Sequence, residues 1–167
     1  MLSTETDVAS TAWPDADWQT LAAAAVSASL TETPHGHLAN SGANVEVSVR
    51  LSDDAEVQAL NKSFRGKDKP TNVLSFPMVQ PDLLGGLANT DDGEILLGDI
   101  ILAAETCARE AGEKGWPLGD YAQHLIVHGL LHLLGYDHET GDFEAAAMES
   151  IETIACARLG LPDPYAD

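Results

Sequence analysis

The chain has few of the residues that mark secreted or membrane proteins. Only two cysteines occur in 167 residues, Cys107 and Cys156, and they form no C-x-x-C pair, so we expect reduced thiols in a cytoplasmic protein. The first ten residues contain no basic residue and no hydrophobic segment, so we expect no secretory signal. No apolar run approaches the roughly 20 residues that a membrane-spanning helix needs, so we expect no membrane partner.

Positive charge is also scarce, and it is unevenly distributed. Eight lysines and arginines stand against 27 acidic residues, which gives a net charge of −19. This charge argues against non-specific nucleic-acid binding by the whole surface. Half of the cations nevertheless fall within eight residues, the basic segment, opposed only by Asp68: Lys62, Arg65, Lys67 and Lys69. Both a solvated turn and a binding site for an anion would explain this cluster, and charge alone leaves the two open.

The hydrophobic pattern predicts one α/β domain. With 44% hydrophobic residues, a chain of this length buries roughly 70% of its unfolded surface, enough for one core. We predict a flexible N-terminus over 1–14 and a single domain over 15–167. Alternating or continuous apolar runs predict strands over 45–51, 71–77 and 94–102. Helical patterns cover 15–30, 54–64, 103–114, 118–134 and 141–159, so we expect three or four strands with helices packed on them.

The predicted helix over 118–134 is apolar nearly all round, which is typical of a central, buried helix. Its His128 and His132 are four residues apart and project from one face, and His124 lies a further turn back. Gly135 is suited to end this helix in a left-handed conformation and to turn the chain back. Backbone carbonyls can hold such a histidine pair as well as a metal can, and the pair alone leaves both open.

A third histidine favours the metal. His138 follows Gly135 by three residues, so its imidazole can meet those of His128 and His132 from outside the helix. Three imidazoles suit Zn²⁺, at about 2.0–2.1 Å per nitrogen, with one tetrahedral position left open as in catalytic sites. We therefore predict one Zn²⁺ per chain, in a metal-dependent, hydrolase-like domain with a bound water of pKa about 7.

The residues around the histidines favour one reaction class over another. Metalloproteases with this histidine spacing have a glutamate after the first histidine, and this chain has Gly129 there, so the general base for peptide hydrolysis is missing. A phosphodiester needs cations near its phosphoryl oxygens instead. Arg65 is the strongest candidate because a guanidinium can hold a phosphate through two hydrogen bonds. This interpretation requires the basic segment to reach the metal.

Three stretches resemble the YbeY family of bacterial rRNA maturation factors: HGLLHLLGYDH (128–138), NKSFRGKDKPTNVLSFP (61–77) and LLGDI (96–100). The resemblance spans roughly residues 45–165 and includes LGLPDPY (159–165). It implies an α/β (α+β) fold, with a small mixed four-stranded sheet flanked by about five helices. It also implies a zinc-dependent, single-strand-specific endoribonuclease of 16S rRNA 3′-end maturation and ribosome quality control. Its zinc ligands correspond to His128, His132 and His138, and its functional arginine to Arg65.

The high negative charge qualifies this resemblance. If only the basic segment meets phosphates, intrinsic RNA affinity is weak and its salt dependence shallow. We therefore expect two kinds of partner: single-stranded RNA, including 16S rRNA, and the ribosome or a ribosomal protein that supplies further affinity.

Several further residues allow two interpretations. For His124 we favour a buried histidine that supports a ligand or the core over a substrate contact. Asp137 would either orient a ligand imidazole or cap the turn. Asp99 interrupts an apolar strand and must be paired or functional, and the resemblance places it near the cleft. Strand-edge residues and cations beside Arg65 would either line an RNA groove or serve the scaffold: Lys67, Lys69, Asn72 and Ser75.

Two other functions stay open from the sequence. One is a metallopeptidase-like hydrolase, which the missing glutamate disfavours. The other is a non-catalytic ribosome-assembly factor, in which the zinc is structural and the basic segment docks on rRNA or a ribosomal protein. For a nuclease, the nucleophile would be either water or the 2′-hydroxyl of the substrate.

Overall fold

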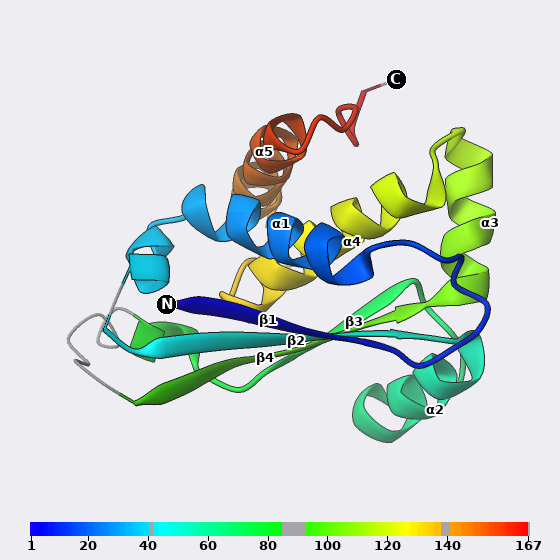
Figure 1. Ribbon diagram of the computed structural model, residues 1–167, viewed down its shortest axis with the longest axis horizontal. Coiled ribbons are helices and arrows are strands. Elements are labelled where there is room, and N and C mark those ends of the chain that lie inside the picture. Colours follow the sequence, from blue (N-terminus) through cyan, green and yellow to red (C-terminus); the bar gives the residue numbers. More distant parts are fainter. Residues whose placement is uncertain (41, 85–92, 138–140, 167) are drawn as a thin grey trace.

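The structure is a computed structural model that describes residues 1–40, 42–84, 93–137 and 141–166 (Figure 1). Four strands form one sheet in the order β1-β2-β4-β3. Strands β1 (Leu2–Val8), β2 (Asn44–Ser52) and β4 (Glu94–Ala103) are parallel, and β3 (Val73–Pro77) is antiparallel to β4. The prediction of a small mixed four-stranded sheet is confirmed.

Five α-helices pack around this sheet in the described part of the chain, as predicted. Helices α1 (Trp18–Thr31) and α4 (Leu118–Leu133) cover one face of the sheet, and α5 (Asp142–Arg158) packs on these two helices. Helix α2 (Asp54–Arg65) lies on the other face, and α3 (Ala104–Lys114) follows β4 (Figure 1). A short 3₁₀ helix spans Gly36–Asn40. None of the helices in the described ranges combines the length and the apolar character that crossing a membrane requires.

The sheet follows from the hydrophobic pattern of its central strands. In β2 the alternate residues Val45, Val47, Val49 and Leu51 are at most 1% exposed and face α1 and α4. In β4 both faces are covered at one end, because Ile100 joins the main core while Ile101 packs with Val57 of α2. Burial on both sides explains the near-continuous apolar run of this strand.

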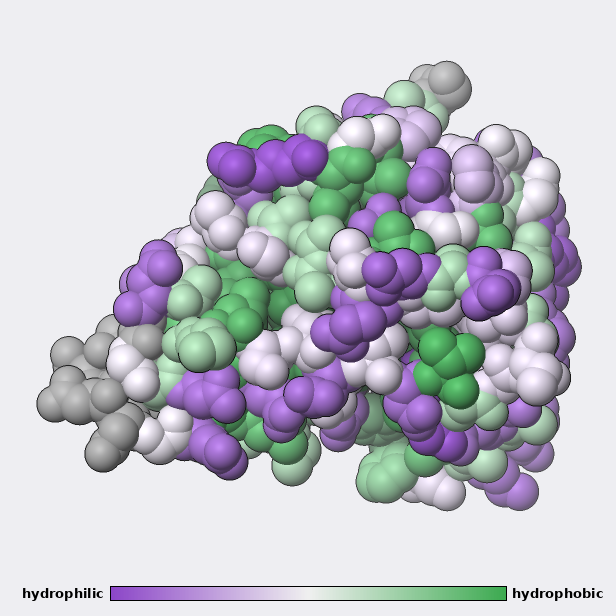
Figure 2. All heavy atoms as spheres, viewed as in Figure 1, coloured by the Kyte–Doolittle hydropathy of each residue, from purple (hydrophilic) through white to green (hydrophobic). Residues whose placement is uncertain are grey.

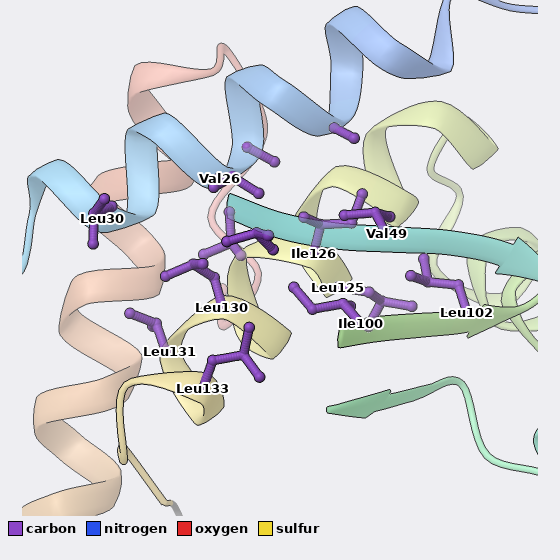
Figure 3. Close-up of a cluster of buried hydrophobic side chains, with 14 of the residues drawn as sticks. Val26, Leu30, Val49, Ile100, Leu102, Leu125, Ile126, Leu130, Leu131 and Leu133 are labelled. Atoms are coloured by element: carbon purple, nitrogen blue, oxygen red, sulfur yellow. The ribbon is translucent and has the colours of Figure 1, made fainter. Parts of the chain in front are cut away.

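Helix α4 is the centre of the core. Eleven of its sixteen residues are buried, and Figure 3 shows its side chains between those of α1 and those of β2 and β4. The helix lies very close to the sheet at Gly129, where a Cβ atom would be 2.9 Å from Ile100 Cγ2 and 3.1 Å from Ser75 Oγ. Glycine at this position therefore allows the backbone of α4 to approach β3 and β4.

The N-terminus corrects the prediction of a flexible segment over 1–14. Residues 2–8 form β1, a parallel edge strand paired along its whole length with β2. Trp13 is 5% exposed, and its indole N–H donates to Ser52 O at 2.8 Å. The strand was missed because Ser, Thr, Asp and Glu fill it, and only half-buried or polar side chains, such as Thr4 and Thr6, face the helices.

Figure 2 shows hydrophilic residues spread over this face of the molecule, with smaller apolar areas between them. Helix α4 ends as expected: Gly135 adopts a φ of 97°, and its N–H donates to His132 O at 3.0 Å. This turn directs the chain back, so that Asp137 lies in the lining of the pocket described below.

Candidate active site

A cavity of about 430 Å³ lies between the end of α2, strand β3 and the C-terminal half of α4. It brings the basic segment and the histidine helix together, although they are about sixty residues apart in the chain. This cavity is called the candidate pocket, or simply the pocket, below. Its lining residues are Asn61, Arg65, Lys67, Lys69, Thr71, Asn72, Val73, Ser75, His128, His132 and Asp137.

Helix α2 and the turn after it position the cations of the pocket. The helix begins where Asp53 Oδ1 accepts a hydrogen bond from Glu56 N, and it ends at Gly66, which has a φ of 70°. The buried Asn61 then fixes the loop beyond the helix, because its Nδ2 donates to Lys69 O at 2.9 Å. The left-handed turn and this bond fold the loop back along α2.

The single acidic residue of the basic segment does not line the pocket. Asp68 accepts a hydrogen bond from Gln58 Nε2 at 3.0 Å and lies 3.8 Å from Lys62 Nζ. Both partners are on α2, so the carboxylate offsets Lys62 instead of the other cations. Among the described residues, the charged lining of the pocket is therefore three cations and one carboxylate, Arg65, Lys67, Lys69 and Asp137, in a chain whose net charge is −19.

The two described histidines of the pocket face each other. Their Nε2 atoms are 3.0 Å apart and their ring centroids 4.6 Å apart. On the other side of its ring, His128 Nδ1 lies 2.7 Å from Glu152 Oε1. A carboxylate only accepts hydrogen bonds, so this contact assigns the proton of His128 to Nδ1 and directs Nε2 to His132. Imidazoles that bind a metal are commonly held in this way.

Glu152 contacts the pocket histidine His128 from behind, and the sequence interpretation did not single it out. Its side chain is fully buried, and it accepts from His128, from His124 Nε2 at 3.0 Å and from the Tyr165 hydroxyl at 2.6 Å. Burial alone raises the pKa of the Glu152 carboxyl, but the hydrogen bonds from His124, His128 and Tyr165 outweigh burial and lower the pKa to about 2. The helix predicted over 141–159, which is α5, carries several acidic residues, and none of them was assigned a role from the sequence. Glu152 follows the buried Met148 by one helical turn and therefore lies on the same face of α5. This spacing would have distinguished Glu152 from the exposed acidic residues of the helix.

His124 lies in the core, outside the lining of the pocket. It is 8% exposed, and its ring lies among those of Trp116, Tyr121 and Tyr165, with centroids about 6 Å away. Its contact with Glu152 connects it to His128, and so it adjoins the pocket only through that carboxylate.

Asn72 and Ser75 line the pocket, but their polar groups also serve the scaffold. Asn72 Nδ2 donates to Glu110 Oε1 at 2.9 Å, and its Oδ1 accepts from the Val73 N–H at 2.7 Å. Ser75 Oγ donates to the carbonyl of Gly129 at 3.1 Å, which joins β3 to α4. These bonds align the floor of the pocket.

The structure separates Asp99 from the pocket and corrects the expectation that it lies near the cleft. Its register partners are Ser48 of β2 and Phe76 of β3, on the sheet face away from α4. There it lines a different cavity of about 450 Å³, together with Arg50. Alternation explains the difference, since Ser75 points to α4 and the next residue along β3 points away.

The third predicted ligand, His138, lies outside the described residues. Within the ranges that the structure describes, no group of three or more His, Cys, Asp or Glu side chains is arranged to hold a metal ion. His128 and His132 supply two converging nitrogens, and Asp137, next to His138 in the chain, lines the same pocket. These residues fit two ligands of an imidazole site for Zn²⁺.

The position of Gly129 also bears on the peptidase hypothesis. A side chain here would start toward Ile100 and Ser75, at 2.9 and 3.1 Å, on the sheet side of α4. A glutamate cannot fit there without displacing the side chains of Ile100 and Ser75. The general base of a metalloprotease therefore has no room at the position that its sequence motif requires.

The chain matches the family model described as Endoribonuclease YbeY over residues 5–160. Several curated proteins named Endoribonuclease YbeY are similar over more than nine tenths of their length. The protein of Sphingopyxis alaskensis is 64% identical over 168 residues, covering 100% of this chain and 99% of its own. Those of Rhizorhabdus wittichii and Zymomonas mobilis are 61% and 46% identical and cover 92% and 100% of this chain and 91% and 94% of their own.

Among solved structures, the fold is similar to the solution structure of TM1509 from Thermotoga maritima. The TM-score is 0.53, with 22% sequence identity and full coverage of both chains. This likeness supports the α+β architecture, the mixed sheet and the helices around it.

Proposed function

This chain belongs to the YbeY family of endoribonucleases, and from that premise we propose that it is a zinc-dependent, single-strand-specific endoribonuclease acting in 16S rRNA 3′-end maturation and ribosome quality control. The observation that carries the proposal is the meeting of Arg65 with His128 and His132 in one pocket. Cleavage of an RNA phosphodiester needs a cation beside the phosphate and a metal site at the same place. Arg65 supplies the cation, and His128 and His132 supply two candidate metal ligands.

His128, His132 and His138 would hold the metal. Two facts about the described residues support this assignment: the Nε2 atoms of His128 and His132 face each other at 3.0 Å, and Glu152 occupies the opposite nitrogen of His128. When bound, zinc supplies a Lewis acid that polarises the scissile phosphate and makes water more acidic.

The cations of the pocket act on the phosphate. In the proposed mechanism, the Arg65 guanidinium donates two hydrogen bonds to non-bridging oxygens and stabilises the charge that grows on them in the transition state. Lys67 and Lys69 hold the flanking phosphates of the strand as point charges. Asn61 and Asn72 align this loop and the strand edge behind it through their bonds to Lys69 and Glu110.

The charge of the whole chain supports a partner on the ribosome. Three cations in one pocket give few phosphate contacts, and the net charge of −19 repels the rest of an RNA. A ribosomal protein or the ribosome itself would bring the 16S rRNA end to the pocket. We place this activity in the cytoplasm, where Cys107 and Cys156, both buried and free, stay reduced.

The test is cleavage of an end-labelled single-stranded RNA by zinc-loaded protein. Arg65→Ala should lower the cleavage rate at least tenfold at equal metal content. Arg109→Ala is the matched control, since it removes the same charge from an exposed residue of α3 that pairs with Glu113, and it should retain the rate within twofold. Equal cleavage by the Arg65 and Arg109 variants would contradict the proposal.

A further inference from the structure

The buried carboxylate behind His128 holds two parts of the chain at once. Glu152 Oε1 accepts from His128 Nδ1, and Oε2 accepts from both His124 Nε2 and the Tyr165 hydroxyl. Its side chain has no exposed surface, whereas that of Tyr165, beyond the end of α5, is 44% exposed. Burial of a carboxylate costs desolvation free energy, and the hydrogen bonds from the three donors offset this cost only if each of them is made.

The C-terminal tail is itself fixed so that Tyr165 reaches this carboxylate. Asp163 Oδ1 accepts from the Tyr165 N–H at 2.9 Å and from Thr153 Oγ1 at 3.4 Å, which ties the tail back onto α5. The Tyr165 ring then stands edge-on to His124, with centroids 6.3 Å apart. Figure 1 shows the tail leaving the end of α5. The hydroxyl meets Oε2, which leaves Oε1 for His128.

The pattern of donors determines the state of the His128 ring. Since Glu152 only accepts, the ring nitrogen that contacts it carries the proton, and the other nitrogen, Nε2, presents its lone pair to the pocket when the ring is neutral. With the proton on the other nitrogen, Nδ1 and Oε1 would be two acceptors 2.7 Å apart. The contact therefore selects one tautomer and one ring orientation.

We propose that Glu152 is a positioning residue that fixes His128 with its proton on Nδ1 and its Nε2 toward the pocket, and that Tyr165 of the C-terminal tail holds Glu152 in place for this task. The proposal rests on the proposed function in one respect, since the Nε2 so presented is the atom assigned to zinc. It extends the active site to a residue beyond the last helix, about 30 positions after His132.

A different role would be purely structural, with Glu152 and Tyr165 contributing only to folding. The two roles differ in what they change. If Glu152 and Tyr165 only support folding, their replacement lowers the melting temperature but does not change the tautomer of His128 or the zinc affinity of the folded protein. Loss of a positioning residue changes both in the folded protein.

The first measurement needs no metal. Long-range proton–nitrogen correlation spectra of the imidazole rings, recorded on metal-free protein, distinguish the two tautomers of His128. We expect the Nδ1-protonated form in the natural chain and a mixture in Glu152→Gln, because the neutral amide is a weaker acceptor and can also donate. Glu149→Gln is the matched control, since it makes the same change at an exposed position on the same helix, and should leave the spectrum unchanged. A single Nδ1-protonated form in Glu152→Gln would overturn the proposal.

The second measurement is zinc affinity, by competition with a chromophoric chelator. Glu152→Gln should raise the Kd for Zn²⁺ by at least about tenfold, and Glu152→Asp should restore part of the loss. Tyr165→Phe, which removes one hydroxyl from a half-exposed side chain and so leaves the core intact, should raise the Kd at least threefold. Tyr121→Phe removes a comparable hydroxyl bond, to Glu110 at 2.7 Å, and should change the Kd by less than twofold. Equal affinities for the Tyr165 and Tyr121 variants would overturn the role of the tail.

The two measurements separate this proposal from the proposed function. If the natural chain binds no zinc but the tautomer changes as expected in Glu152→Gln, the positioning of His128 stands and the zinc assignment fails. If the natural chain binds zinc and cleaves RNA while Glu152→Gln keeps both tautomer and affinity, the function stands and the positioning role fails.

Discussion

Asn61 and Lys69 are joined by a 2.9 Å hydrogen bond from the buried side-chain amide to the main-chain carbonyl. The bond crosses from the last turns of α2 to the far end of the basic segment. It closes the loop that follows Arg65, the last residue of α2, and that carries Lys67 and Lys69 at the pocket.

We therefore predict that Asn61→Ala affects stability and cleavage together. The Lys69 carbonyl loses its partner, which should lower the free energy of unfolding by about 1–3 kcal/mol. The freed loop should lower the cleavage rate several-fold at saturating zinc. Urea denaturation and RNA cleavage measure the two effects, and a loss of stability with a full cleavage rate would show that the loop needs no such anchor.

The close approach of α4 to the sheet gives a second prediction. Gly129→Ala places a methyl group 2.9 Å from Ile100 Cγ2 and should lower the free energy of unfolding by about 1–3 kcal/mol. Gly112→Ala is the control, because a Cβ there meets nothing within 4 Å in helix α3, and it should raise stability by about 0.5–1 kcal/mol. Thermal or urea unfolding of both variants checks the opposite signs. Equal effects would contradict the packing of α4 against Ile100.

Glu152 predicts a pH dependence of stability. Its folded pKa of about 2 lies below the ordinary value of 4.5, so its contribution is complete above about pH 5 and is lost as the pH falls toward 2. The natural metal-free chain should lose about 2 kcal/mol more than Glu152→Gln between about pH 5 and about pH 3. Urea unfolding of both proteins across this range checks it. Parallel curves would show that other carboxylates dominate acid unfolding.

The small number of pocket cations predicts a shallow salt dependence. If Arg65, Lys67 and Lys69 make the phosphate contacts, the logarithm of the binding constant for single-stranded RNA should fall against the logarithm of salt concentration with a slope of about −2. Lys67→Ala should reduce the slope by about 0.7. Fluorescence anisotropy with metal-free protein measures both. A slope steeper than about −5 would mean that phosphate contacts extend well beyond the pocket.

Local patterns predicted the central strands and all five helices to within a few residues, because the apolar periodicity of β2 and α4 reflects burial directly. Strand β1 escaped prediction because its stability comes from pairing with β2, whereas its own side chains are mostly polar. Pairing of this kind leaves no trace in a local sequence pattern.

The candidate site was predictable in part for a similar reason. The spacing of His128 and His132 on one helix and the charge of the basic segment are local features of the sequence. The meeting of Arg65 with these histidines depends on the packing of β3 against α4, and the partnership of Glu152 with His128 depends on how α5 crosses α4. Both are tertiary relationships, and only the family resemblance pointed to the first.

Helix α4 presents His128 and His132 to the pocket and buries most of its other residues in the core. A substitution in this helix therefore rarely changes activity alone. Variants selected for altered cleavage would also differ in the amount of folded protein in the cell, where a loss of 1–2 kcal/mol can change abundance several-fold. Substitutions in α4 are therefore limited both by the pocket and by the packing of the core. The loop after α2 is exposed, so substitutions there change the pocket with fewer effects on stability.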